Sequence, residues 1–170
     1  MGANTLANIE QECGGSIARG LKPFLHIARR DEVTSIPAAT NMVVSTNMVM
    51  ATTPAGTFKK FAVSTVITKN SFKVEQVGDA DSINYKITAT YKIAGVTPAK
   101  MQILSGVPGC EFILICPDKN GNKWLVGDVD DGATVTWVAD IGGEENAYTL
   151  TVEWNTSHPP YNYTGTITAA

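Results

Sequence analysis

The amino-acid sequence predicts a mainly β protein, an antiparallel β-sandwich or barrel of about eight or nine strands with one or two short helices. Apolar and polar residues alternate throughout residues 83–93, and residues 110–116 are almost wholly apolar. Gly, Asn, Asp and Pro, which mark turns, also recur at short intervals along the chain. The length of 170 residues fits one folding unit, in which we expect an N-terminal arm over residues 1–40 and a β domain over residues 41–170.

The N-terminal arm differs in composition from the rest of the chain. It has glycines at positions 14, 15 and 20, and glycine favours irregular backbone. We expect one short helix over residues 3–12 and one short helix or strand over residues 24–28. Such an arm is expected to pack against another subunit or to wrap its own sheet. The candidates for inter-subunit contact are its basic residues, Arg19, Lys22, Arg29 and Arg30.

The chain after the arm is expected to form strands. Residues 42–50 and 57–67 are rich in apolar residues and Thr, and residues 53–56 between them read Thr-Pro-Ala-Gly, so we expect a hairpin. Residues 72–77 predict a third strand. The clearest strand is 83–93, with one buried and one hydrated face. The hydrated face carries ammonium and hydroxyl groups, on Lys86, Thr88, Thr90 and Lys92.

Residues 98–105 predict a short helix. Thr97 fits the N-cap, Pro98 the first helical position and Gly106 the stop. The apolar run 110–116 then predicts a strand that is buried on both faces.

The remaining strands follow turn signals. Asn120-Gly121 is a strong hairpin signal, so we expect the chain to return over residues 123–129. Further strands are expected over residues 134–139, 147–154 and 161–167.

The composition argues against a surface that binds nucleic acid tightly. The net charge is −3, and 17% of the residues are charged, compared with about 25% in average proteins. A Thr-rich surface with few charges suits burial against other subunits. It suits the half-exposed face of a strand equally well. The N-terminus lacks the charged start and apolar stretch of a signal peptide, and we expect no membrane segment.

The sequence carries no pattern that predicts catalysis, and we expect no enzyme, cofactor or metal. The histidines are His26 and His158, and no nucleophile elbow or phosphate-binding loop occurs. Asp118-Lys-Asn-Gly-Asn begins like a calcium loop, but Val129 stands where the bidentate Glu is needed. The acidic residues around Gly132 favour a turn. We expect reduced, structural thiols at Cys13, Cys110 and Cys116.

The tryptophans leave one binding function open. Trp137 and Trp154 alternate in phase with apolar neighbours, which favours the core over a sugar-stacking platform. Trp124 follows an exposed turn and is the best candidate for a carbohydrate-binding or adhesive β-sandwich.

Several segments of the chain resemble structural proteins of tailed bacteriophages that infect gut anaerobes, namely tail tube and tube-like ring proteins. The resemblance covers most of the chain, and is strongest in its C-terminal two-thirds. It is carried by residues 97–100 (TPAK), 112–115 (FILI), 118–128 (DKNGNKWLVGD), 145–152 (ENAYTLTV) and 160–167 (PYNYTGTI). Residues 14–18 and 27–37 are similar as well.

This resemblance implies a structural virion protein. Such subunits form stacked hexameric rings whose strands join into the wall of a channel through which DNA passes. The implied location is the virion tail, after synthesis in the host cytoplasm. The implied partners are copies of the chain, other tail or connector proteins, and genomic DNA in transient, non-specific contact. On this view Lys86, Thr88, Thr90 and Lys92 would face the lumen, and a head–tail connector or tail terminator ring is the alternative.

Overall fold

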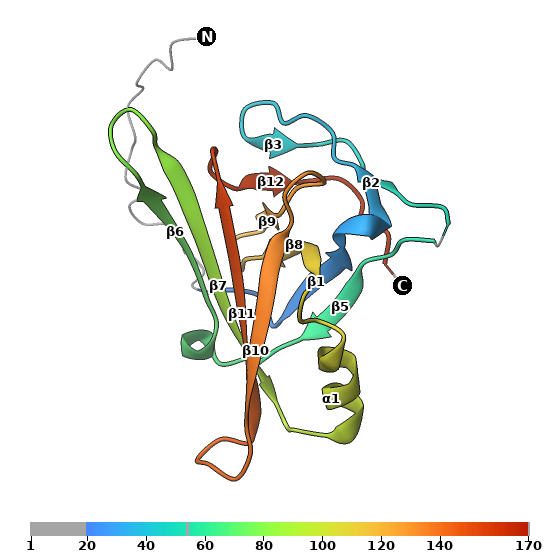
Figure 1. The fold of residues 1–170 in the computed structure, drawn as a ribbon, viewed down its shortest axis with the longest axis vertical. Coiled ribbons are helices and arrows are strands. Elements are labelled where there is room, and N and C mark those ends of the chain that lie inside the picture. The colour runs from blue at the N-terminus through green and yellow to red at the C-terminus, as the bar shows by residue number, and fades with distance from the viewer. Residues whose placement is uncertain (1–19, 54, 170) are drawn as a thin grey trace.

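The computed structural model of the protein describes residues 20–53 and 55–169 (Figure 1). The predicted mainly β class is confirmed: within these residues, a ten-stranded sheet and a separate two-stranded sheet are accompanied by one α-helix. The large sheet is barrel-like but does not close.

The element bounds follow chain order. The strands are β1 (Phe24–Arg29), β2 (Val33–Ser35), β3 (Val43–Val44), β4 (Val49–Met50), β5 (Lys59–Ala62), β6 (Ser71–Val77), β7 (Asn84–Ala94), β8 (Glu111–Pro117), β9 (Lys123–Val126), β10 (Ala133–Asp140), β11 (Ala147–Thr156) and β12 (Tyr161–Tyr163). The helix is α1 (Pro98–Ser105), and single 3₁₀ turns cover Arg30–Glu32 and Ile67–Lys69.

The sheet branches at β8. One edge of β8 pairs with β1, whereas the other edge is shared by β9 and, at its beginning, by β10. The chain leaves this edge at Gly127 and returns at Ala133. Gly127 has a φ of +98°, and an added Cβ would lie 2.5 Å from the carbonyl oxygen of Phe112. Only glycine allows the backbone to turn away at this place.

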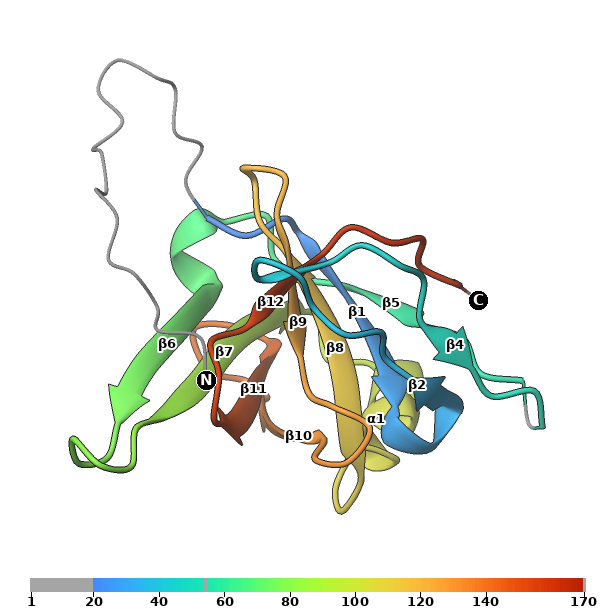
Figure 2. The same ribbon diagram turned by 90° about the horizontal axis from the view of Figure 1, so that it is seen from above.

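Two arms of the sheet extend from this branch. The first runs through β10, β11 and β7 to β6, with every neighbouring pair antiparallel. The second runs through β9 and β12 to β3, which is parallel to β12. In sheet order β8 lies between the two arms. Seen from above, β6 and β7 diverge from β8 and β9 (Figure 2).

A separate core lies on each face of β8. Phe112, Leu114 and Cys116 belong to the larger core, which the first arm and β1 enclose. Ile113 and Ile115 point the other way into a second core that the β9, β12 and β3 arm helps to cover. The prediction that this strand is buried on both faces is therefore confirmed.

Helix α1 forms where the sequence predicts it. The Thr97 side chain accepts a hydrogen bond from the Lys100 backbone N–H at 3.3 Å, and Pro98 occupies the first turn. Gly106 ends the helix in a right-handed conformation, with φ of −83°. Leu104 is the buried residue that anchors the helix to the large core. Within the described residues, no helix is long and apolar enough to cross a membrane.

The hairpin expected between residues 42–50 and 57–67 is wrong. Residues 42–50 contain the two short strands β3 and β4, and β4 pairs with β2 whereas β5 pairs with β1. The polar residues between β3 and β4 bend the chain, and Val44 and Met48 both enter the second core. Burial of these two side chains together outweighs the local turn signal.

The last expected strand is also shorter than residues 161–167. It ends at Tyr163, because side chains bind the backbone that follows. The Tyr163 hydroxyl donates to the carbonyl of Thr166 at 2.8 Å, and Asn47 Oδ1 accepts from the Thr166 N–H at 2.7 Å.

The described part of the predicted N-terminal arm packs within the domain: β1 joins the large sheet and β2 pairs with β4 in the small one. β1 lies between β5 and β8, and Leu25, Ile27 and Ala28 are buried. The helix expected over residues 3–12 lies outside the described residues, as do Cys13 and Arg19.

Candidate functional site

The residues predicted for a lumen face share one side of β7, and three more strands extend that side. In the antiparallel register Thr88 lies between Lys73 of β6 and Glu153 of β11, and Thr151 of β11 lies beside Thr136 of β10. We call this surface the polar face. Its members are Ser71, Lys73, Glu75, Lys86, Thr88, Thr90, Lys92, Thr134, Thr136, Val138, Asp140, Thr149, Thr151, Glu153 and Asn155.

The opposite side of the same strands is the large core. Ile87, Ala89 and Tyr91 of β7 are fully buried, as are Leu150 and Val152 of β11. The alternation predicted for residues 83–93 is therefore confirmed from Ile87 to Tyr91, whereas Ile83 lies before β7 and is 42% exposed. Since one side of these strands is committed to the core, the polar face is the side left for contact with other molecules.

The charges on the polar face largely cancel. Each of its lysines has a carboxylate partner: Lys73 Nζ lies 2.6 Å from Glu75, Lys86 Nζ 3.9 Å from Glu153, and Lys92 Nζ 3.9 Å from Glu145. The hydrogen bond from Lys73 lowers the pKa of the Glu75 carboxyl. Such exposed pairs add little stability, but they leave a hydrated surface dominated by threonine hydroxyls.

Both margins of this four-stranded unit are open among the described residues. β6 pairs with β7 alone, and its outer edge has no partner strand. β10 pairs with β8 only at Ala133 and Thr134, so the edge from Val135 onward has no partner strand either. A strand edge without a partner is a template for pairing with another chain.

Three of the basic residues predicted for inter-subunit contact lie within the described residues, and they do not form one cluster. Arg29 pairs with Asp31 at 3.5 Å, and Arg30 Nη1 lies 2.5 Å from Glu111. Lys22 lies elsewhere, where its backbone N–H donates to the Pro117 carbonyl at 3.0 Å.

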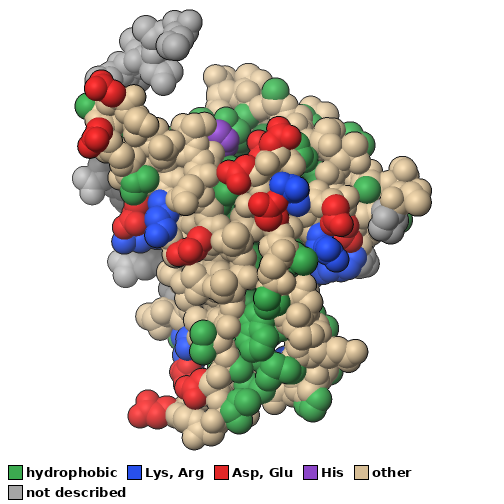
Figure 3. All heavy atoms as spheres, in the orientation of Figure 1, with side chains coloured by type: hydrophobic (Ala, Val, Ile, Leu, Met, Phe, Trp, Pro, Cys, Tyr) green, Lys and Arg blue, Asp and Glu red, His purple; other side chains and the backbone are tan. Residues whose placement is uncertain are grey.

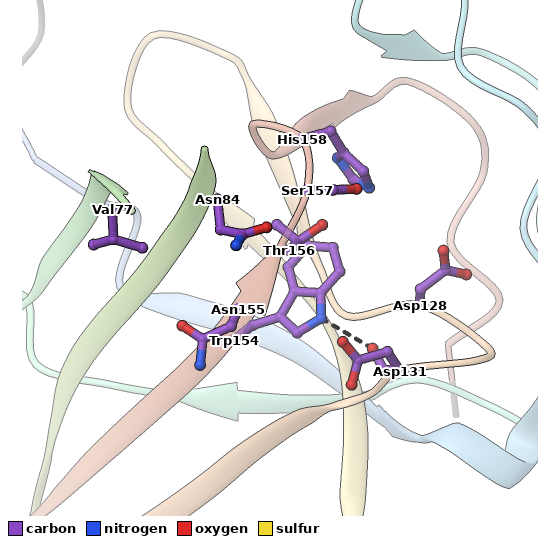
Figure 4. Close-up of a pocket in the computed structure, with 9 residues that line it drawn as sticks. All are labelled: Val77, Asn84, Asp128, Asp131, Trp154, Asn155, Thr156, Ser157 and His158. Carbon is purple, nitrogen blue, oxygen red and sulfur yellow. Dashed lines mark hydrogen bonds between the residues drawn. The ribbon is translucent and has the colours of Figure 1, made fainter. Parts of the chain in front are cut away.

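A polar hollow of about 690 Å³ opens at the upper end of β11 (Figure 4). Asp128 and Asp131 line one side of it, Asn84 and Asn155 the other, and Trp154 lies between them. The Trp154 indole is almost fully buried and donates to the Asp131 carbonyl at 3.0 Å. The sequence did not predict this hollow, because its walls come from three separate parts of the chain.

His158 contributes structure to this hollow. Its ring stacks on Tyr161 at 4.2 Å between centroids and meets Trp154 edge-on at 5.6 Å. One ring nitrogen, Nδ1, lies 2.8 Å from the Pro159 carbonyl oxygen. Among the described residues, no three His, Cys, Asp or Glu side chains gather as a metal site would require. The hollow therefore has polar walls, and the described residues around it do not form a metal-ligand cluster.

The indole N–H groups of the three tryptophans all donate hydrogen bonds to other groups of the protein. Trp124 donates to Asp118 Oδ2 at 3.1 Å, and Trp137 donates to the Leu104 carbonyl at 2.8 Å, as Trp154 does to Asp131. Trp124 is half-buried and packs against the large core. A sugar platform would need free indole faces, which this arrangement does not favour.

The Asp118 loop is a hairpin turn, as predicted. Asp118 Oδ1 accepts hydrogen bonds from the Asn120 and Asn122 N–H groups, each at 2.9 Å. Partial burial raises the pKa of this carboxyl, but hydrogen bonds from Asn122, Trp124 and Asn120 outweigh burial and leave the pKa below its ordinary value.

The described thiols lie at the two ends of β8. Cys110 is half-buried just before the strand, and Cys116 is fully buried within it, where burial raises its pKa to about 12. A thiol with so high a pKa is inert as a nucleophile.

Comparison with known proteins gives no relative. No family model, no curated protein and no solved structure matches the chain.

Proposed function

We propose that this chain is a ring-forming structural subunit of a phage tail, in which the four-stranded units of neighbouring copies join into the wall of a DNA channel. One observation carries the proposal. The β6, β7, β11 and β10 unit has one free polar face and two open margins. The resemblance to tail tube proteins agrees with this arrangement.

The strand order makes the two margins compatible with each other. Neighbouring strands are antiparallel in the order β6, β7, β11, β10, so β6 and β10 run in opposite directions. If each copy is rotated about an axis roughly parallel to the strands, β10 of one copy meets β6 of the next in antiparallel orientation. The contact joins two different surfaces, so repetition closes a ring when the rotation allows.

The side-chain pattern at the two margins also matches. Phe72 and Val74 of β6 lie on the core side of the sheet, as do Trp137 and Ala139 of β10. Val74 is nevertheless 41% exposed. Joining the margins would place apolar side chains beside apolar ones and would continue the polar face without interruption.

A wall of this kind suits the passage of DNA. Affinity for DNA depends on clustered cations that neutralise phosphates, whereas the lysines of the polar face are each balanced by a carboxylate. Threonine hydroxyls would keep the wall hydrated without holding the polymer.

The test is whether Val74→Lys prevents ring formation. We expect the unaltered chain to form rings at high concentration in negative-stain images and mass photometry. A lysine buried at the margin would weaken each contact by at least about 1.4 kcal/mol, a tenfold loss of affinity. Since a ring repeats this contact at every subunit, the number of ring particles should fall at least about tenfold. The matched control is Val49→Lys, because Val49 is also exposed but lies in β4, away from both margins. An unaltered chain that stays monomeric would refute the proposal, as would rings that Val74→Lys leaves intact.

A single closed ring, as in a head–tail connector or tail terminator, is favoured by one observation. The two hairpins of the four-stranded unit point to opposite ends of the molecule (Figure 1). Both loops are acidic: Asp79 and Asp81 lie in one, and Glu144 lies in the other beside Glu145, which pairs with Lys69 and Lys92. Direct contact between these ends would bring like charges together. Filaments of the purified protein would favour the tube, and isolated rings the single-ring protein.

A further inference from the structure

A second surface lies in the seam between β5 and α1, where the large sheet fails to close. We call it the seam groove. Phe61, Ile93, Ile103 and Leu104 supply its apolar lining over about 230 Å³. Through Phe61 and Ile103 it continues into a neighbouring hollow of about 210 Å³ against Val107 and Phe112. Hydrophobic side chains also gather over the lower end of β10 and α1 in the space-filling view (Figure 3).

The backbone of β5 is open along this groove. The Val63 N–H donates to Pro23 beside β1 at 3.0 Å, and antiparallel pairs alternate, so the N–H and C=O groups of Lys60 and Ala62 face away from β1. Phe58 and Ser64 on the same edge are bonded, at 2.8 Å to Thr168 and 2.7 Å to Lys92. The described residues supply no backbone partner for Lys60 and Ala62. This opening is long enough for a hairpin tip and too short for a long added strand.

Two lysines on the rim of the groove have no carboxylate within ion-pair distance among the described residues. Lys60 Nζ lies 4.4 Å from the centre of the Phe24 ring. Lys100 Nζ donates to the carbonyl groups of Ala94 at 2.6 Å and Gly95 at 3.1 Å. The groove is therefore apolar inside and positive at its rim.

The β6–β7 hairpin tip has the complementary chemistry. Asp79 and Asp81 are exposed, and neither lies within ion-pair distance of a cation in the described part of the chain. Val77 and Ile83 flank the tip and are 39% and 42% exposed. This tip lies at one end of the molecule, whereas α1 lies toward the other end (Figure 1).

We propose that the β6–β7 tip of one copy enters the seam groove of another copy, so that rings stack end to end. The inference rests on the ring proposed above and adds the contact between rings. Asp79 and Asp81 would pair with Lys60 and Lys100, while Val77 and Ile83 would cover the apolar lining. Because the tip and the groove differ and lie toward opposite ends, repetition gives an open stack and not a closed pair. Pairing each acidic tip with a basic groove also avoids the repulsion between acidic ends.

A charge-reversal cycle in the full-length chain tests this contact. Asp79→Lys/Asp81→Lys and Lys60→Glu/Lys100→Glu should each reduce filaments at least about tenfold in negative-stain images, while single rings remain. Combining all four substitutions should restore filaments, because the ion pairs are rebuilt with the charges exchanged. Glu144→Lys, in the other exposed hairpin, is the matched control and should keep its filaments.

Carbodiimide cross-linking supplies an independent measurement. It joins carboxylates to amines in direct contact, so mixed isotope-labelled chains should give links from Asp79 or Asp81 to Lys60 or Lys100 between different molecules. Rings that never stack, filaments that survive both double variants, or a quadruple variant that forms rings only would each overturn this inference and leave the ring proposal standing. A chain that never forms rings would overturn both.

Discussion

Strands β7 and β8 belong to one sheet, but they differ in what their two faces contact. β8 has a core on each face, so almost every residue in it stabilises the fold. β7 buries one face and leaves the other hydrated. Substitutions in β8 therefore test stability, whereas substitutions on the polar face of β7 can change assembly while the fold survives. The sequence already shows the difference, as a continuous apolar run in β8 and strict alternation in β7.

The largest contrast is expected between Ile113→Ala and Thr90→Ala. Ile113 is fully buried in the second core, and its truncation should lower the free energy of unfolding by about 2–5 kcal/mol. Thr90 lies on the polar face, so its truncation should cost less than about 1 kcal/mol. Urea unfolding followed by tryptophan fluorescence measures both. Equal losses would show that the polar face is as important to the fold as β8.

The next contrast concerns the branch point beside β8. Gly127→Ala places a methyl group against the Phe112 carbonyl at a positive φ, and it should cost about 2–4 kcal/mol, from strain and lost pairing. Gly121→Ala is the matched control, because Gly121 also has a positive φ but open space around it, and it should cost about 1 kcal/mol. Thermal unfolding compares the two variants. If both variants lose the same stability, the close approach of the backbone at Gly127 does not contribute to the free energy of unfolding.

Local patterns predict the elements that depend on neighbours in the sequence. β7 follows from period two, α1 from its Thr97 cap and Pro98, and β8 with its turn from an apolar run before Asn-Gly. β3 and β4 could not be predicted, because two-residue strands carry no period. Met42 adopts a positive φ angle of 64°, which its residue type does not indicate, whereas Asn41, with a φ of 50°, belongs to a type that is enriched there.

The candidate site was predictable only along one strand. Period two places Lys86, Thr88, Thr90 and Lys92 together, but their neighbours on β6, β10 and β11 are set by long-range register. The open margins follow from strand order, which the pattern of each strand does not encode. The seam groove depends on the place where the sheet fails to close. The open margins and the seam groove depend on the order of the strands in the sheet, which the periodicity of the sequence does not predict.

The smallest effect is expected at the turn that joins β8 to β9. The pKa of Asp118 is lower in the folded protein than its ordinary value of 3.8, so the unfolded chain binds the proton more readily. The carboxylate therefore adds stability above pH 3.8, and this contribution is lost as the pH falls through the folded pKa. Asp118→Asn lacks this contribution. The thermal midpoint of Asp118→Asn should lie below that of the unaltered chain at pH 7, and the two should converge below pH 3.8.

Trp124→Phe separates the charge of Asp118 from the shape of the turn. It removes one donor to the carboxylate and leaves a smaller aromatic ring in place of the indole that packs against the large core. It should therefore reproduce part of the pH-dependent loss while leaving the turn in place. A difference between Asp118→Asn and the unaltered chain that is the same at pH 7 and pH 3 would assign the effect to turn geometry. The ionised carboxylate would then have no share in holding the β8–β9 hairpin.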